Sequence, residues 1–326
     1  MMIPAKLRPG DELRVVSPSS SMGILSPEVI TFASQRLESL GLKVTFGRNA
    51  SLRDEFDSSP VEARLQDIHQ AFADPQVRGI LTSIGGYNCN QLLNRLDYEL
   101  VRRNPKILCG YSDITALSCA IYTRCDLVTY SGPHFSTFGM LHGLEETLRG
   151  FQRCLMEPGP FTLHPAKMWS DDGWYRDQEN RTFLPSSGWH PIHPGRARGV
   201  LLGGNLCTLN LLQGTPYMPS LSGALLLLED DYESKPLTFD RDLQSLLHQP
   251  SSVGVQGMLI GRFQVASGMS LSALGNLVNA KPELADLPLA AHADFGHTTP
   301  QFTFPIGGEG ILSVSHTGAK LEILEH

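Results

Sequence analysis

Short runs of apolar residues, separated by amphipathic segments, recur through the first part of the chain. Runs of this length with turn residues on either side are typical of buried strands. The expected strands are Leu13–Val16, Leu42–Phe46, Gly79–Ile84, Ile107–Cys109 and Leu127–Tyr130. Because helical patterns lie between them, the sequence predicts a mostly parallel sheet with helices on both faces. Ligands of such sheets bind beyond the carboxyl ends of the strands.

Two of the intervening segments carry helix start signals. Ser26 followed by Pro27 is an N-cap with proline at the first helical position, and Gly41 closes that helix. The stretch 59–62, Ser-Pro-Val-Glu, has the spacing of a capping box. The next helix has one apolar stripe at helical spacing, which predicts core packing. The stripe consists of Val61, Leu65, Ile68 and Phe72.

The alternation stops at about Phe138 and resumes at Gly199. The intervening segment contains several prolines, a polar stretch, SDDGWYRDQENR, and all three tryptophans, Trp169, Trp174 and Trp189. We interpret it as a linker with an ordered excursion from the fold.

The last part of the chain again alternates strand and helix patterns. The expected strands are Val200–Leu202, Ala224–Leu228, Gly257–Ile260, Leu289–His292 and Ile311–Val314, and the expected helices lie near Asn205–Leu212, Phe239–His248 and Ser272–Asn279. The sequence therefore predicts an N-terminal α/β domain over residues 1–140, a linker with the tryptophan-bearing loop over 141–196, and a smaller mixed α/β domain over 197–326.

Composition narrows the class of protein. The 326 residues carry a formal charge of −7, which argues against a nucleic-acid surface because phosphate binding needs clustered Lys and Arg. No apolar run is long enough to span a bilayer, and the N-terminus has no signal-peptide core, so we expect a cytoplasmic protein. The six cysteines form no CxxC pair, which favours buried free thiols over disulfides or zinc ligands. Cys109, within an apolar strand, is expected in the core.

The most informative motif is Gly110-Tyr111-Ser112-Asp113, between an apolar strand and a helical pattern. A serine on a tight strand-to-helix turn exposes its hydroxyl at the sheet edge, and the backbone N–H of Asp113 can stabilise an oxyanion. Ile114 replaces the last glycine of G-x-S-x-G, which disfavours a strict α/β-hydrolase. The alternative, that Ser112 or Asp113 only caps the helix, is equally compatible with this motif alone.

Two glycine pairs also follow expected strands. The turn with Gly85 and Gly86 can bring a second oxyanion donor close to a ligand, although a plain tight turn is the favoured interpretation of that fragment alone. The pair Gly203-Gly204, followed by Asn205, can line the same cleft. This second pair fits no phosphate-binding loop, because no Gly-Lys-Ser/Thr follows.

A carboxylate and a histidine end two further strands. Glu229 directly follows a leucine run, where it can orient a histidine, whereas a solvated acidic loop is the favoured interpretation of this stretch alone. His297 lies in a loop rich in Gly, Thr and Pro, although a lone histidine is usually structural. Ser112, Glu229 and His297 together predict a catalytic triad whose parts come from two domains.

At these residues the sequence resembles the LD-carboxypeptidase family of serine peptidases. The similar stretches extend over nearly the whole chain and are SIGGYNCNQLL, GYSDITAL, TYSGP, RGVLLGGNLCTLNLLQGTPYMP, LLLLEDDYE and DFGHTTPQFTFPIG. The resemblance implies a flavodoxin-like, amidotransferase-like N-terminal domain, a homodimer, and no metal or organic cofactor. It also implies that Ser112 is the nucleophile, His297 the general base and Glu229 its partner. The oxyanion hole would combine the amide of Asp113 with one from Gly85 or Gly86.

Two branches of that family are relevant. One removes the terminal D-amino acid from murein tetrapeptides, and the other resembles the microcin C immunity peptidase, which cleaves aminoacyl-nucleotide conjugates. The tryptophan-bearing segment is more similar to the immunity branch. That similarity implies that Trp174 or Trp169 stacks on a nucleobase, with ordinary packing of a long loop as the alternative. Asn205 is a further candidate for substrate binding, and Arg262 is an unranked candidate for a substrate carboxylate.

These features favour a serine amidase or carboxypeptidase that acts through an acyl-enzyme on a small peptide-like or aminoacyl-nucleotide substrate. A rival from another class is a module that binds such a ligand without hydrolysis, which has no use for an intact triad. A glutaminase-type amidotransferase is the weakest alternative, because those enzymes carry cysteine where this chain has Ser112.

Overall fold

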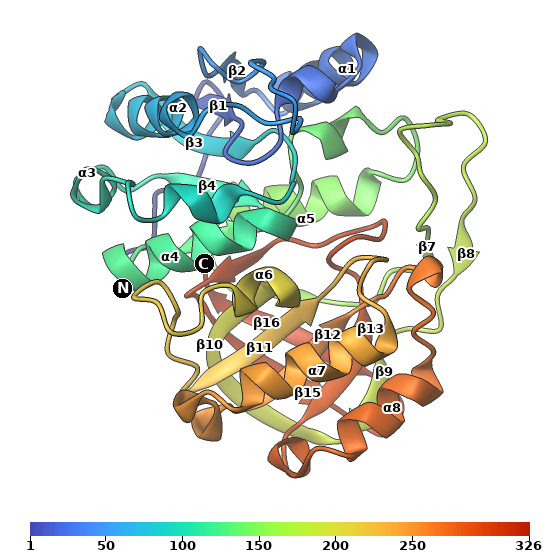
Figure 1. Ribbon diagram of the computed structural model, residues 1–326. Coiled ribbons are helices and arrows are strands. Elements are labelled where there is room, and N and C mark those ends of the chain that lie inside the picture. The colour runs from blue at the N-terminus through green and yellow to red at the C-terminus, as the bar shows by residue number, and fades with distance from the viewer.

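The computed structural model describes residues 1–326 and contains two large sheets, one above the other in Figure 1. The first sheet has the strand order β14-β5-β4-β3-β1-β2. Its strands are β1 (Glu12–Val16), β2 (Lys43–Phe46), β3 (Val77–Thr82), β4 (Ile107–Gly110), β5 (Thr129–Ser131) and β14 (Phe304–Ile306). The first five pair in parallel, which confirms the predicted parallel sheet. The antiparallel β14, which comes from the end of the chain, was not expected.

Helices connect the parallel strands. They are α1 (Pro27–Glu38), α2 (Val61–Ala73), α3 (Tyr98–Arg103), α4 (Thr115–Cys125) and α5 (Glu145–Leu155). Ser26 caps α1 as predicted, because its side chain accepts a hydrogen bond from the Val29 N–H. The expected capping box at Ser59 is wrong: Pro60 takes the cap position without a side-chain bond, and α2 begins one residue later than a Ser59 cap requires.

The second sheet is mixed and has the strand order β6-β16-β15-β10-β11-β12-β13-β9. Its strands are β6 (Phe161–Leu163), β9 (His190–His193), β10 (Gly195–Asn205), β11 (Ala224–Glu229), β12 (Gly257–Gly261), β13 (Leu289–Ala293), β15 (Glu309–Val314) and β16 (Ala319–Glu325). The four central strands, β10 to β13, run in parallel. The helices of this half are α6 (Leu206–Asn210), α7 (Pro236–Leu247) and α8 (Leu271–Asn279). The mixed α/β class is therefore as predicted.

The segment interpreted as a linker is more regular than its sequence suggested. It contains α5 and β6, and β9 adds an edge strand to the second sheet. Its two remaining strands, β7 (Met168–Trp169) and β8 (Leu184–Pro185), pair with each other and carry an arm beside both sheets (Figure 1). None of the helices is both long and apolar enough to cross a membrane.

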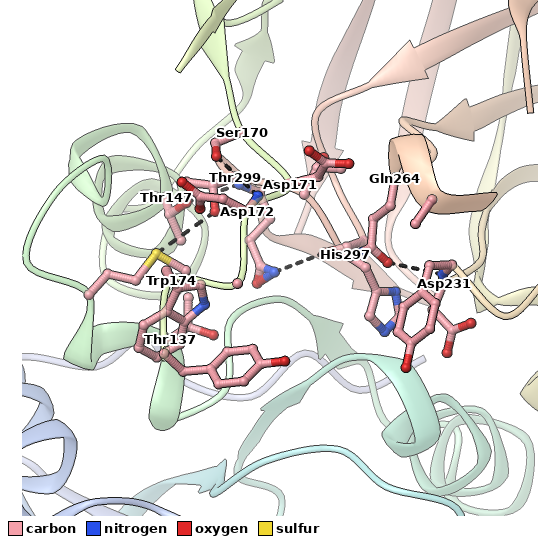
Figure 2. Close-up of a pocket in the computed structure, with 18 of the residues that line it drawn as sticks. Thr137, Thr147, Ser170, Asp171, Asp172, Trp174, Asp231, Gln264, His297 and Thr299 are labelled. Atoms are coloured by element: carbon pink, nitrogen blue, oxygen red, sulfur yellow. Dashed lines mark hydrogen bonds between the residues drawn. The ribbon is translucent and has the colours of Figure 1, made fainter. Parts of the chain in front are cut away.

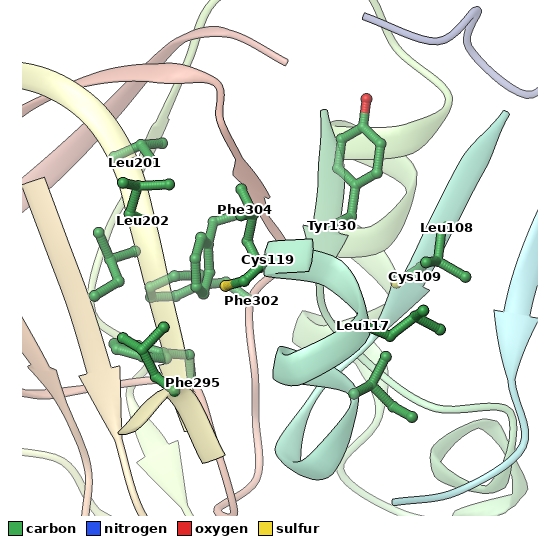
Figure 3. Close-up of a cluster of buried hydrophobic side chains, with 14 of the residues drawn as sticks. Leu108, Cys109, Leu117, Cys119, Tyr130, Leu201, Leu202, Phe295, Phe302 and Phe304 are labelled. Atoms are coloured by element: carbon green, nitrogen blue, oxygen red, sulfur yellow. The ribbon is translucent and has the colours of Figure 1, made fainter. Parts of the chain in front are cut away.

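One hydrophobic core joins the two halves, and α4 lies within it. Figure 3 shows Leu117 of α4 directed toward Leu108 of the first sheet, and Cys119 directed toward Phe302 and Phe304. A helix that is apolar on all sides is normally buried. In α4, seven consecutive residues from Thr115 onward are buried. Because α4 begins three residues after Ser112, this packing fixes the serine turn against the second half.

Candidate active site

Ser112 lies on a strained turn between β4 and α4. Its backbone has φ 59°, in the left-handed region that non-glycine residues rarely adopt. The turn is held by the buried carboxylate of Asp113, which accepts hydrogen bonds from the Ser19 hydroxyl and the Cys89 N–H. Burial raises the pKa of Asp113, and these bonds oppose the rise. No side chain caps α4, so the helix-cap alternative for Ser112 and Asp113 is wrong.

Glu229 and His297 reach the serine from the second half. Glu229 is the last residue of β11 and is buried, and His297 lies in the loop after β13. The His297 Nδ1 is 2.7 Å from the Glu229 Oε2, and its Nε2 is 3.0 Å from the Ser112 Oγ. Gly296 makes this approach possible: its φ is 95°, and a Cβ there would lie 2.4 Å from the Glu229 Oε2.

The charges around His297 favour its protonated form. Burial lowers the pKa of His297, but the Glu229 carboxylate raises it by attraction and by hydrogen bonding, with smaller contributions from Asp231 and Asp230, so the net pKa is above its ordinary value. Asp230 is itself almost fully buried beside Glu229. Burial and the Glu229 charge raise the pKa of Asp230 to about 7. A histidine with this environment can hold a proton taken from Ser112.

The turn after β3 lies next to the serine. A Cβ on Gly85 would lie 3.1 Å from the Ser112 Cβ and 3.2 Å from its Oγ. The backbone N–H groups of Gly85 and Gly86 donate no hydrogen bond to any other group of the chain. Gly86 lies farther along, where a Cβ would meet the Ser19 and Ser20 hydroxyls. Gly85 is thus the glycine of this pair in contact with the nucleophile turn.

A pocket of about 500 Å³ opens beside His297. Figure 2 shows His297 and Asp231 on one side of it and Trp174 with Thr137 on the other. The lining is predominantly polar. It includes Tyr111, Arg176, Gln264, Thr298 and Gln301. The pocket can therefore take a ligand with several hydrogen-bonding groups next to the serine.

The tryptophan-bearing arm forms one wall of this pocket and is fastened to both halves. Ser170 and Thr299 exchange two backbone hydrogen bonds of 2.8 and 2.7 Å, which ties the arm to the loop of His297. Asp172 pairs with Arg181 within the arm at 2.6 Å, and the Gln178 amide donates to the Gly139 carbonyl of the first half at 2.9 Å. The arm is therefore an ordered part of the site.

The residues predicted to bind substrate occupy different places. Trp174 lines the pocket. Trp169 lies over the guanidinium of Arg262, 4.8 Å from ring centroid to Cζ, and Arg262 is buried against Asp294. Asn205 is also buried: its side chain caps α6 and donates to Asp230 at 3.1 Å. Of this set, only Trp174 lines the pocket beside His297.

Sequence reasoning missed two groups near the proposed triad: Asp230, beside Glu229, and His134, near the serine turn. Asp230 follows Glu229 within the same acidic run, so its position was visible but its burial was not. His134 follows the TYSGP stretch, which contains β5, the strand beside β4. That position after a neighbouring strand was the only available signal. Its imidazole packs against the Tyr111 ring, with 4.3 Å between ring centroids and an interplanar angle of 30°.

The cysteines fit the core interpretation, with one correction. Cys109 is buried in β4, and burial raises the pKa of its thiol. Four others are buried, but Cys207, at the start of α6, is exposed. No group of three or more His, Cys, Asp or Glu side chains is arranged to hold a metal ion.

Comparison with known proteins gives the family. The family models described as the LD-carboxypeptidase N-terminal and C-terminal domains match residues 13–132 and 198–312. A relative named "Putative carboxypeptidase YocD" from Bacillus subtilis is 54% identical over 100% of both chains. A second relative from Bacillus subtilis, named "Probable murein peptide carboxypeptidase", is 29% identical over 98% of this chain and 94% of its own.

Two solved structures are similar throughout. The crystal structure of an MccF-like protein from Bacillus anthracis superposes with a TM-score of 0.99, at 50% identity and 100% coverage of both chains. The microcin C7 self-immunity protein MccF in complex with aspartyl sulfamoyl adenosine has a TM-score of 0.90 and 26% identity, and covers 100% of this chain and 99% of its own.

Proposed function

The chain belongs to the LD-carboxypeptidase family, and we propose that it hydrolyses a peptide-like amide bond with Ser112 as nucleophile, His297 as general base and Glu229 as the group that orients the imidazole. The observation that carries the proposal is the hydrogen-bonded series from Ser112 through His297 to Glu229, with contacts of 3.0 and 2.7 Å. Nucleophile, base and orienting group within such reach characterise this chemistry on unrelated folds.

In the first half-reaction, the Ser112 Oγ attacks the amide carbonyl carbon and its proton passes to the His297 Nε2. Backbone N–H groups of Asp113 and Gly85 stabilise the oxyanion, at ~3 kcal/mol per donor. The C–N bond then breaks, and His297 returns the proton to the leaving amine. Glu229 keeps the Nδ1 proton in place and stabilises the imidazolium while it exists.

In the second half-reaction, His297 takes a proton from water, whose oxygen attacks the acyl carbon. The bond to the Ser112 Oγ breaks, the proton returns to Oγ, and the acid is released. The residues supply all proton transfers, so the mechanism requires no metal or organic cofactor.

For the substrate, we propose aminoacyl-nucleotide conjugates of the microcin C type. Trp174 supports this choice, because an aromatic side chain in the pocket wall can stack on a nucleobase. The complex of MccF with aspartyl sulfamoyl adenosine supports it by similarity. The second candidate is removal of the terminal D-amino acid from murein tetrapeptides, which the relative named for murein peptides favours.

The test is a paired hydrolysis assay read by mass spectrometry. Wild type, Ser112→Ala and Ser118→Ala are each given aspartyl sulfamoyl adenosine and a murein tetrapeptide. Ser118 is a matched control, because its buried hydroxyl on α4 has no hydrogen-bond partner. We expect wild type and Ser118→Ala to release aspartate, and Ser112→Ala to lose at least 1,000-fold in rate, on the order seen for triad members.

Each other outcome has a distinct meaning. Release of D-alanine from the tetrapeptide alone would assign the murein reaction and leave the triad in place. Full turnover by Ser112→Ala would refute the nucleophile. Tight binding of either ligand by wild type without any cleavage would favour the non-hydrolytic module.

We further propose that the protein is a cytoplasmic homodimer organised in the parts 1–140, 141–196 and 197–326. The resemblance to the family supports the dimer. Size-exclusion chromatography with light scattering should give twice the chain mass of 35.7 kDa. A mass of one chain across the micromolar range would contradict it.

A further inference from the structure

Arg64 of helix α2 is a buried cation without an acidic partner. The residue is only 3% exposed, and its guanidinium forms no ion pair with any carboxylate. Burying a charge is costly unless hydrogen bonds replace the lost contacts with water. The acceptors that surround Arg64 therefore indicate what the charge holds in place.

The guanidinium binds two loops at once. Its Nη1 donates to the Pro18 carbonyl, in the loop after β1, at 3.1 Å. The same nitrogen donates to the carbonyl and the Oδ1 of Asn88, in the loop after β3, at 3.1 and 3.0 Å. Its Nη2 donates to the Gln91 Oε1 at 2.7 Å. Because α2 packs on both β1 and β3 (Figure 1), Arg64 ties the ends of these two strands to each other.

Both loops also bind the carboxylate of Asp113, the residue after the proposed nucleophile. In the loop after β1, the Ser19 hydroxyl donates to Asp113, one residue beyond Pro18. In the loop after β3, the Cys89 N–H donates to the same carboxylate at 2.8 Å, one residue beyond Asn88. In each loop, the group that Arg64 holds is thus adjacent along the chain to the group that holds the nucleophile turn.

The loop after β1 positions the Gly85 turn as well. The Ser20 N–H donates to the Gly85 carbonyl at 3.0 Å. A Cβ on Gly86 would lie 2.4 Å from the Ser20 Oγ, so the two loops are in close contact there. The place of the Gly85 N–H therefore depends on the loop that Arg64 binds through Pro18. A shift of about 1 Å between catalytic groups can cost about 100-fold in rate.

We propose that Arg64 is a positioning residue for the oxyanion hole, and that it holds the two loops so that the proposed donors, the N–H groups of Gly85 and Asp113, stay in register. The proposal rests on the proposed function, since it needs Ser112 as the nucleophile. Arg64 does not line the pocket beside His297, so it should affect the chemical step and not the affinity for a ligand in that pocket.

A second cavity gives a chemical test of this role. Arg64 lines a cavity of about 540 Å³, whose wall also includes Ser20 and Asn88. In Arg64→Ala, guanidinium ion added at millimolar concentration can enter from this cavity and occupy the place of the lost group. Such rescue restores the hydrogen bonds of the guanidinium without restoring the side chain.

The measurement is labelling of Ser112 by a fluorophosphonate probe, whose phosphoryl oxygen takes the oxyanion position. The kinetics are resolved into the affinity for the probe and the rate constant of the chemical step, at a temperature where every variant is folded. In Arg64→Ala we expect the rate constant to fall about 100-fold with little change in affinity. Guanidinium chloride should restore part of the rate constant, and sodium chloride at the same concentration should not.

Lys106→Ala is the matched control. Lys106 is also a buried cation that donates to backbone carbonyls, those of Ala71 and Asp74 at the end of α2, but it precedes β4 and does not follow a strand. Its removal should lower the melting temperature and leave the rate constant of labelling within about twofold of wild type.

The outcomes distinguish this role from a structural one. A slow chemical step in Arg64→Ala that guanidinium restores, with Lys106→Ala near wild type, supports the proposal. A wild-type rate constant in Arg64→Ala, a loss equal to that of Lys106→Ala, or a loss that guanidinium does not restore overturns it.

If Arg64→Ala does not fold, Arg64→Lys decides the question. Lysine keeps the charge, but its single nitrogen cannot serve all four acceptors of the guanidinium. The chemical step should then slow about tenfold, and a wild-type rate constant would overturn the proposal. Failure of wild type to be labelled at Ser112 would overturn the proposed function, and the role of Arg64 with it.

Discussion

The carboxyl group of Asp230 is buried next to the proposed triad and is only partly hydrogen-bonded. It accepts hydrogen bonds from the Asn205 amide and the Asp231 N–H, both at 3.1 Å, but its Oδ2 has no partner. Burial and the Glu229 charge raise its pKa to about 7. The folded protein therefore binds this proton more tightly than the unfolded chain does, and stability falls as the pH rises toward 7.

Asp230→Asn should remove this pH dependence, because an amide is neutral at every pH and still accepts the Asn205 bond. Relative to wild type, we expect the variant to gain on the order of 2 kcal/mol in free energy of unfolding between pH 5 and pH 8. The measurement is urea unfolding of both proteins at the two pH values. An equal difference at pH 5 and pH 8 would show that Asp230 does not hold a proton in the folded state.

At the residue scale, the sequence predicted groups that follow strands and missed groups defined by tertiary burial. Ser112, Glu229 and His297 each follow a strand whose apolar run was recognisable. Because these strands belong to two different sheets, the prediction that the three residues meet rested on the combination of motifs and on the family resemblance. The interactions of His134 depend on the neighbouring strands β3 and β4, which no local pattern reveals. Asn205 was expected to bind substrate, but its side chain is occupied by α6 and Asp230.

At the element scale, the arm between β7 and β8 presents its two tryptophans to different surroundings. Trp174 lines the pocket and Trp169 packs on Arg262. Trp174→Ala should raise KM for aspartyl sulfamoyl adenosine about fivefold, since stacking contributes about 1 kcal/mol, while Trp174→Phe retains most of the affinity. Trp169→Ala should leave KM within about twofold and lower the melting temperature, because Arg262 loses its cation–π partner.

Steady-state kinetics and thermal unfolding of the three variants check this assignment. A higher KM in Trp169→Ala with an unchanged KM in Trp174→Ala would exchange the roles of the two tryptophans. A murein tetrapeptide serves as the control substrate: because it has no nucleobase, its KM should not respond to Trp174→Ala.

The elements that the sequence predicted well are the central parallel strands, which are buried on both faces and therefore appear as continuous apolar runs. The elements that the sequence did not predict are edge strands and segments that pair with strands far away along the chain. Strand β14 contains Pro305, and it pairs with β5 only because the chain returns to the first sheet after the loop of His297. Helix α5 was overlooked because its residues were grouped with the proline-rich segment that follows.

At the scale of the whole molecule, the proposed triad depends on how closely the two halves dock. The contact is α4 against β10, where Gly204 has no side chain to hold Thr115 away. The Thr115 Oγ1 accepts the Asn205 N–H at 3.0 Å, and Gly204 has φ 113° with the Thr115 side chain directly over it. Ser112 comes three residues before Thr115, and Glu229 pairs with Asn205 across the strands. A displacement at Gly204 therefore separates the nucleophile from its base.

Gly204→Ala tests this coupling, because the added Cβ would lie 2.5 Å from the Thr115 Oγ1. We expect kcat/KM to fall about 100-fold, since a shift of about 1 Å between catalytic groups can cost that much. Gly214→Ala is the matched control: Gly214 also has a positive φ, of 75°, but a Cβ there meets no atom within 4 Å. If backbone strain alone were responsible, both variants would lose stability and neither would lose much activity. The double variant Gly204→Ala/Thr115→Ala removes the collision between the two side chains and should recover part of the lost kcat/KM. If kcat/KM does not recover, the loss comes from distortion of strand β10 itself and not from the contact between the two halves.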